Sequence, residues 1–245
     1  MSIRSLLFTL LTISGALAAR GQQFVTHGKI EFERKTNQHS LLEESSMWDE
    51  AMKKNSPKFH TAYFDLYFKD GLTLYKPGRE PEVRQMKLFQ TFPSDNTIQT
   101  NLSTDSSTVQ KDIMNDLYII SSATRKIDWK IGTEIRKIAG FDCRKAVGRV
   151  MDSLVVIAFY TDEIVPSGGP ESFSGLPGMI LGLAIPRMHA TWYATKLELI
   201  DISDKDLAAP KKGKKTTKED FNGRLTEMLK DWGNEGKRMI PMILL

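Results

Sequence analysis

The sequence predicts a mainly β protein of the α+β class, in which a curved antiparallel sheet, or half-barrel, packs against one or two helices. Several short segments alternate apolar and polar residues with the period of two that a half-buried strand requires. Asp70-Gly71 separates two such segments, and this dipeptide is typical of tight hairpin turns. Helical periodicity is confined to two segments, near residues 40–54 and 216–232.

The first half of the chain supplies most of the strand signals. The clearest is the segment 62–69, in which Ala62, Phe64, Leu66 and Phe68 alternate with Tyr63, Asp65, Tyr67 and Lys69. Further strands are expected at 24–33, 72–75, 86–92, 97–102 and 117–120. A helix is expected to begin at the capping box Ser40-Leu41-Leu42-Glu43, to bury Leu41, Trp48 and Met52, and to end before Pro57.

The second half continues the sheet and ends in a helix. Strands are expected at 127–130, around Cys143, and at 154–160, 180–185 and 191–199. After the basic run 211–215, which we interpret as a solvated loop, a second capping box at Thr216 precedes a helix that Gly233 can end. Its apolar stripe consists of Phe221, Leu225, Met228, Leu229 and Trp232. The apolar tail 239–245 either packs on the sheet, which we favour, or binds another molecule.

The N-terminal residues 1–18 have the pattern of a secretory signal peptide. Arg4 is followed by an uncharged apolar run, and Ala16-Leu17-Ala18 fits a small-residue cleavage site. This run is too short to span a membrane, and no later segment is long and apolar enough to do so. We therefore expect an exported protein of the periplasm or cell surface. Its single β-rich domain would cover 19–245, with 210–236 forming the basic loop and C-terminal helix.

Composition excludes several functional classes. Cys143 is the only cysteine, which excludes an internal disulfide and a cysteine-based zinc site. In its strand it is expected to serve as a small buried hydrophobe rather than as a reactive thiol. The formal net charge of +4 is too small to favour nucleic acid as the partner. No cofactor is indicated.

The most unusual stretch is 167–181, which contains four glycines and two prolines before it turns abruptly apolar. Glycine permits positive φ and proline fixes φ, so this stretch is expected to be a shaped loop that leads into a buried strand. Within it, the loop Gly175, Leu176, Pro177 and Gly178 is the candidate ligand-binding motif.

The motif also carries a family resemblance. Gly175-Leu176-Pro177-Gly178-Met179-Ile180 resembles the hexapeptide that names the GLPGLI family of secreted Bacteroidetes proteins, with Met179 in place of leucine. Trp129, the segment 137–146 and Tyr160-Thr161-Asp162-Glu163-Ile164 resemble further recurring patterns of that family. The resemblance implies an exported protein with a half-barrel similar to periplasmic lipoprotein carriers. It implies no biochemical activity.

The sequence offers little for catalysis or metal binding. The segment around Ser174 lacks the first glycine of a G-x-S-x-G elbow, and a strand rather than a helix follows it. Asp162 and Glu163 are adjacent, so a strand would point them to opposite faces. The four histidines have no metal-ligand spacing, and His189 is expected in a solvated turn. The glycines of the motif lead into a strand and so form no phosphate-binding loop.

These observations favour a non-enzymatic binding or accessory module. An apolar groove between sheet and helix would bind a lipid or an apolar peptide, although we favour the simpler interpretation that the same side chains fill a dry core. The expected lining is Phe64, Leu66, Phe68, Trp129, Met179, Leu181 and Trp192. Two alternatives remain: an extracytoplasmic hydrolase with a site near 167–178, and an accessory protein that docks on an outer-membrane receptor.

Overall fold

The computed structural model describes residues 24–41, 47–82, 95–113, 115–151 and 154–245. The expected signal peptide, the strand expected at 86–92 and the capping glutamate Glu43 lie outside these ranges. The described part of the chain confirms a mainly β fold with few short helices.

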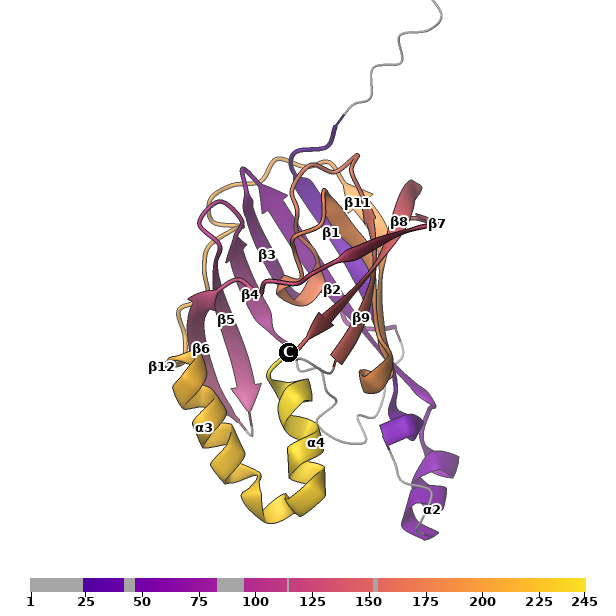
Figure 1. Ribbon diagram of the computed structural model, residues 1–245, viewed down its shortest axis with the longest axis vertical. Helices are drawn as coiled ribbons and strands as arrows, with labels where there is room; N and C mark the ends of the chain where they lie inside the picture. Colours follow the sequence, from indigo (N-terminus) through magenta and orange to yellow (C-terminus); the bar gives the residue numbers. More distant parts are fainter. Residues whose placement is uncertain (1–23, 42–46, 83–94, 114, 152–153) are drawn as a thin grey trace, which may run out of the picture.

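Twelve strands form one sheet in the order β12-β6-β5-β4-β3-β2-β1-β11-β10-β9-β8-β7 within the described residues (Figure 1). The strands are β1 (Gly28–Asn37), β2 (Phe59–Lys69), β3 (Leu72–Pro77), β4 (Thr97–Asn101), β5 (Ser106–Ile113), β6 (Asp116–Ala123), β7 (Lys130–Ile138), β8 (Phe141–Val150), β9 (Leu154–Thr161), β10 (Met179–Ile185), β11 (Ala190–Glu198) and β12 (Lys214–Thr216). All neighbours are antiparallel except β12, which pairs with β6 in parallel, so the predicted antiparallel sheet acquires one parallel edge.

Local sequence explains the hairpins. Asp70 (φ 49°) and Gly71 (φ 76°) both have positive φ, as a two-residue turn that matches the twist of its strands requires. The turn sets the register of β2 and β3, in which Leu66 lies opposite Tyr75. That register continues across the sheet and places one row of side chains on the same face: Ile30, Leu66, Tyr75, Ile98, Val109 and Ile120.

The sheet is strongly curved, and β7 and β8 cross in front of its centre in Figure 1. Gly182 of β10 has Ile138 of β7 close above it: a Cβ at that glycine would lie 2.8 Å from Ile138 Cδ1. The inner face of the curve carries the main hydrophobic core, which includes Phe32, Phe64 and Trp192. The half-barrel expected from the sequence is therefore the arrangement that the strands adopt.

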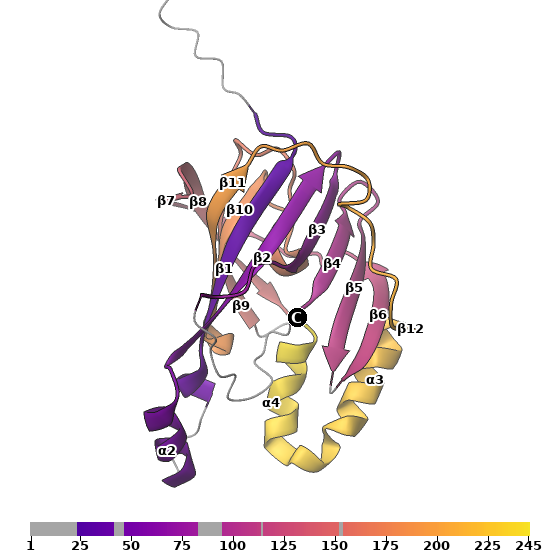
Figure 2. The ribbon, with the colours of Figure 1, turned by 180° about the vertical axis from the view of Figure 1, so that it is seen from behind.

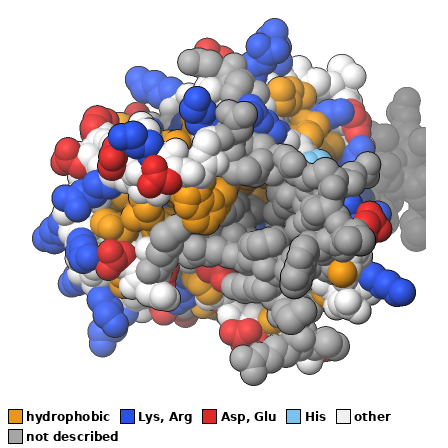
Figure 3. Space-filling model, turned by 90° about the horizontal axis from the view of Figure 1, so that it is seen from below, with side chains coloured by type: hydrophobic (Ala, Val, Ile, Leu, Met, Phe, Trp, Pro, Cys, Tyr) orange, Lys and Arg blue, Asp and Glu red, His pale blue; other side chains and the backbone are white. Residues whose placement is uncertain are grey.

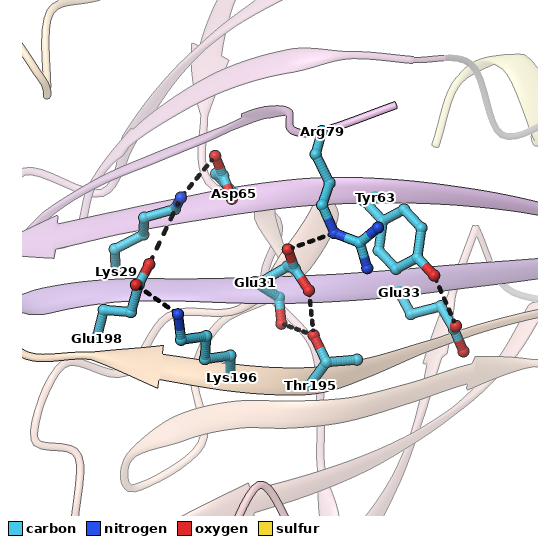
Figure 4. A network of polar contacts seen from close by, with 9 residues as sticks. All are labelled: Lys29, Glu31, Glu33, Tyr63, Asp65, Arg79, Thr195, Lys196 and Glu198. Atoms are coloured by element: carbon cyan, nitrogen blue, oxygen red, sulfur yellow. Dashed lines mark hydrogen bonds and ion pairs between the residues drawn. The ribbon is translucent and has the colours of Figure 1, made fainter. Parts of the chain in front are cut away.

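Figure 2 shows the central strands from behind, on the outer side of the curve. Figure 4 shows a network on this face that joins β1, β2 and β11. Lys29 forms ion pairs with Asp65 at 3.1 Å and Glu198 at 3.7 Å, while Glu31 accepts hydrogen bonds from Thr195 and Arg79. Such an alternation of apolar inner and charged outer residues is typical of a sheet with one solvated face.

The helices lie at the lower end of the half-barrel (Figures 1 and 2). They are α2 (Met47–Asn55), α3 (Lys218–Met228) and α4 (Gly233–Ile243), with short 3-10 turns η1 (Gln38–Leu41), η2 (Pro170–Ser172), η3 (Pro186–Met188) and η4 (Lys230–Trp232). Thr217 caps α3 by accepting a hydrogen bond from the Asp220 amide, one residue later than the capping box expected from Thr216.

The helix α3 and the apolar tail pack on β5 and β6. Phe221, Leu225 and Leu229 are buried as expected, whereas Met228 and Trp232 of the predicted stripe are exposed. Gly233 caps the end of η4 with φ 56°. A further helix, α4, begins at the same residue. Met242, Ile243 and Leu245 are buried, so the tail packs on the sheet within this helix and the two residues after it.

Candidate functional site

The segment Ser167–Gly178, here called the motif loop, is held in a fixed shape by its own contacts. Gly175 (φ 88°) and Gly178 (φ 134°) have the positive φ values that their sequence pattern predicts. The Ser167 hydroxyl donates a hydrogen bond to the Leu176 carbonyl oxygen and accepts one from the Gly175 amide at 3.1 Å. Ile180 then enters β10, so the loop leads directly into a buried strand as expected.

The motif loop inserts one acidic residue, Glu171, into the concave side of the sheet. Pro170 begins the short turn η2, and Glu171 adopts a left-handed conformation (φ 51°) that an ordinary residue rarely takes. Its side chain is 0% exposed. A strained backbone that carries a buried charge is a feature that the surrounding structure must stabilise, and such features gather at functional sites.

Three side chains from distant parts of the chain contact the Glu171 carboxylate. Asn96 donates a hydrogen bond to Oε2 at 2.9 Å, Tyr75 donates to Oε1 at 3.4 Å, and Arg34 Nη1 lies 3.7 Å from Oε1. Trp192 in turn donates to the Tyr75 hydroxyl at 3.2 Å. Burial raises the pKa of Glu171 above its ordinary value, although Arg34 and Asn96 favour the charged form.

Next to this cluster lies a cavity of about 60 Å³ between the inner face of β5 and β6, α3, and the last residues of the chain. Its lining comprises Ser107, Val109, Lys111, Ile120, Ser122, Ala123, Thr124, Arg125, Ser172, Lys218, Phe221, Leu244 and Leu245. Ser172 belongs to the motif loop, so this polar cavity borders the segment that the sequence singled out.

Two cations line this cavity, of which Lys111 is buried and Arg125 is half-buried. Lys111 is 3% exposed, and its ammonium donates a hydrogen bond to the Ile243 main-chain oxygen at 2.6 Å. The Arg125 guanidinium lies 5.2 Å from the centre of the Phe173 ring and donates through Nη2 to the Leu245 main-chain oxygen at 3.3 Å. Burial lowers the pKa of Lys111 to about 8 despite the opposing charge of Glu171. Burial also lowers the pKa of Arg125.

The candidate groove residues lie in the main core. Met179 and Trp192 are fully buried, and Trp129 packs against the same core while its indole nitrogen donates to the Ser174 carbonyl oxygen at 2.9 Å. Leu176 is buried, whereas Gly175 and Pro177 are exposed. The structure thus brings Trp129 to the motif loop, and Trp192 to the Glu171 cluster through Tyr75.

The other residues considered from the sequence occupy separate places. Cys143 is buried in β8, where burial raises the pKa of its thiol to about 12. This environment fits packing rather than reactivity. His189 is exposed at the end of η3 with φ 50°. Across the described residues, no group of three or more His, Cys, Asp or Glu side chains is placed to hold a metal ion.

Sequence reasoning missed Arg34, Lys111, Arg125 and Glu171 as a group. A signal existed in the first two cases: Arg34 follows Ile30 and Phe32 on the buried face of β1, and Lys111 lies between Ser107 and Ile113 on the buried face of β5. A charged residue at an inward position of an alternating strand is costly unless it is compensated. It therefore indicates a partner or a ligand.

The comparisons with known proteins leave the activity open. Residues 148–182, which include the motif loop, match a family model described as "Protein of unknown function (Porph_ging)". No curated protein matches the chain. No described helix has the length and apolar character needed to cross a membrane.

Two solved structures of PNGF-II resemble the fold. The structure in space group P21 has a TM-score of 0.54 and 15% identity, and the similarity covers 82% of this chain and 33% of that one. The structure in space group C2 has a TM-score of 0.53 and 14% identity, with 81% and 32% covered. This chain thus spans about a third of the PNGF-II chains, and at this identity the likeness shows the fold alone.

A third structure, an uncharacterized conserved protein from Thermus thermophilus, has a TM-score of 0.40 and 8% identity over 84% of this chain and 99% of that one.

Proposed function

We propose that this protein is a non-enzymatic binding module of the bacterial envelope, and that its ligand occupies the cavity beside the motif loop. The observation that carries the proposal is the character of the lining. Cations and hydroxyl groups converge there from β5, β6 and the motif loop, while Val109, Ile120 and Phe221 supply an apolar wall. A concave site with a few converging polar groups is typical of ligand binding.

The same lining argues against the hydrolase alternative. None of the described residues around the cavity is a histidine, cysteine, aspartate or glutamate. Ser107 and Lys111 share a strand face but lie four residues apart, which is about 13 Å along a strand. That separation exceeds the hydrogen-bond distance that a nucleophile and its base require. Glu171 is close by but is fully engaged with Arg34, Asn96 and Tyr75.

The burial of the C-terminal tail counts against the alternative in which this tail docks on a receptor. The tail's residues Met242, Ile243 and Leu245 are buried against the protein's own sheet and are not free to dock elsewhere in this state. Viewed from below, hydrophobic side chains are exposed among charged ones (Figure 3). Trp232, 50% exposed, is one of the large hydrophobic residues at the surface. Such scattered exposure is ordinary and does not by itself indicate a partner.

The envelope location in this proposal rests on the sequence of residues 1–18 and on the GLPGLI-type motif. The family whose model matches residues 148–182 has no assigned function, so the match leaves this location open. Export would place the cavity where small envelope molecules are available to it.

Native mass spectrometry of the mature protein, purified from its own source, tests the proposal. A stoichiometric small molecule that is released on denaturation is the expected result, and its identification would define the ligand. A matched preparation with Ser172→Trp, which fills the cavity from the half-exposed loop position, should lose that mass while retaining the fold. A bare-chain mass for the unmodified protein would contradict the proposal.

A further inference from the structure

The two edges of the sheet differ in kind among the described strands. One edge is β12, which has only three residues, all of them polar. The other edge is β7, in which every residue from Lys130 to Lys137 is exposed. The end of the β7–β8 hairpin projects from the side of the molecule in Figures 1 and 2. An edge strand carries unpaired N–H and C=O groups, so β7 is open to pairing with a further strand.

The turn after β7 fixes which of its backbone groups are free. Ala139-Gly140 has positive φ at both residues, 49° and 91°, and Ile138 and Phe141 pair on either side of it, as in a two-residue hairpin. The pair that flanks such a turn exchanges its hydrogen bonds within the hairpin, and the direction of these bonds then alternates along the strand. The N–H and C=O groups of Ile135, three residues before Ile138, therefore point away from β8 and toward the free edge.

The side chains at this edge do not exclude a partner. Ile135 is 58% exposed, although it is a large apolar residue in a strand. Natural edges are commonly protected by charged side chains that repel an incoming strand. The charged neighbours of Ile135 are Glu134 and Arg136, which are 40% and 54% exposed and have opposite signs. Their effect on an incoming strand therefore depends on the charges that the strand carries.

The triplet Glu134-Ile135-Arg136 is complementary to itself in an antiparallel pair. Glu134 forms ion pairs with Arg136 at 2.8 Å and with Lys145 of β8 at 2.7 Å, so these charges lie on one face of the hairpin. If two copies pair with Ile135 opposite Ile135, Glu134 of each copy lies opposite Arg136 of the other. Opposite charges directly across an antiparallel pair are stabilising, and like charges are destabilising.

The charge pattern also selects this register over its neighbours. A pairing centred on Glu134, Arg136 or Lys137 would place that charged side chain opposite its own copy. Of these four consecutive positions, only a centre at Ile135 avoids such a contact. The free backbone groups of Ile135 also allow the two copies to exchange hydrogen bonds at this centre.

We propose that β7 is the interface for a second copy of this chain. The two β7 strands pair antiparallel about a two-fold axis at Ile135 and join two sheets into one. The two isoleucines meet on one face of the joined sheet, and two Glu134–Arg136 pairs form on the other. The same surface is used by both copies, so the assembly closes as a dimer. This inference is independent of the proposed ligand cavity and adds an interaction surface to the protein.

Sedimentation equilibrium of the mature protein tests the inference. We expect a reversible monomer–dimer equilibrium at concentrations up to about 100 µM, because an interface of one strand edge belongs to the small, weak class. Ile135→Pro removes an N–H group that faces the free edge, and it should abolish the dimer while the hydrogen bonds to β8 remain. Circular dichroism checks that this variant keeps its fold. A monomer at every concentration in the unmodified protein would overturn the proposal.

Charge reversal tests the register without changing the backbone. Glu134→Lys and Arg136→Glu should each weaken self-association by about tenfold, because both cross-strand pairs become like-charged. An equimolar mixture of the two variants should associate again, since every charge then lies opposite one of the other sign. A loss of folding in either variant would not produce this recovery.

A matched reversal on another surface is the control. Glu227→Lys changes an exposed charge of α3, far from β7 in Figure 1, and should leave self-association unchanged. Self-association that survives both β7 reversals would place the contact elsewhere and overturn the proposal. Failure of the mixture to associate would overturn the pairing centred on Ile135.

Discussion

The carbonyl oxygen of Thr161 occupies the space that a side chain on Gly178 would need. A Cβ built on Gly178 would overlap this oxygen, and the Thr161 carbonyl carbon would lie 2.8 Å from it. Gly178 also has φ 134°, a conformation that residues with a side chain rarely adopt. The last glycine of the motif is therefore required by the close approach of the end of β9, where Thr161 pairs with Met179.

Replacing Gly178 should destabilise the protein. Gly178→Val adds both a backbone strain and a steric overlap, and we expect it to lower the free energy of unfolding by more than about 1 kcal/mol. Urea denaturation followed by circular dichroism measures the change. Gly223→Ala is the matched control because a Cβ there meets nothing within 4 Å and Gly223 lies inside α3. That control should leave stability unchanged or raise it by up to about 1 kcal/mol.

Glu171 should make stability depend on pH. Its pKa is raised in the folded protein above the ordinary value of 4.5, so the folded state binds this proton more tightly than the unfolded state. The stabilisation that comes from protonated Glu171 is fully present below pH 4.5. It is lost as the pH rises through the raised pKa of Glu171 in the folded protein. Glu171→Gln removes this titration, so the variant should gain stability relative to the wild type as pH rises.

Unfolding free energies of wild type and Glu171→Gln at several pH values from 4 upward check this prediction. A constant difference between the two proteins across that range would contradict a raised pKa. Glu227→Gln, an exposed carboxylate of α3, is the control and should follow the wild-type profile.

Lys111 should produce the opposite dependence at alkaline pH. Its pKa falls from 10.5 to about 8 in the folded protein, so the unfolded state holds the proton more tightly. Stability from this group is present above pH 10.5 and is lost as pH falls through 8. The wild type should therefore gain up to about 3 kcal/mol from this group between pH 8 and 10.5. Lys111→Met should lack that gain, which chemical denaturation at both pH values measures.

The Cys143 thiol should be inert in the native protein. It is 0% exposed, and burial raises its pKa to about 12, so neither access nor thiolate formation favours reaction at neutral pH. Iodoacetamide should modify it slowly in buffer and rapidly in concentrated urea, as followed by mass spectrometry. Equal rates in the two solutions would show that the thiol is accessible in the native state.

Much of the sheet follows from local pattern. The alternation in residues 62–69 and the Asp70-Gly71 turn specify β2, β3 and their register without help from the rest of the chain. The positive φ of Gly175 and Gly178 also follows from the motif itself. By contrast, the helix α4 was missed because Pro241 and an apolar run of only seven residues gave no helical signal. Packing of Ile243 and Leu245 on the sheet supplies its stability instead.

The amino-acid sequence by itself determined the fold class, the hairpin turns and the rigid motif loop, because these depend on side-chain alternation and on backbone freedom at single residues. Only the tertiary structure decided that Glu171 of the motif loop meets Arg34 of the first strand, and that Lys111, Arg125 and Ser107 line one cavity. Sheet order and curvature create these encounters. No local pattern encodes them, because curvature brings together inward-facing residues from strands that are far apart in sequence.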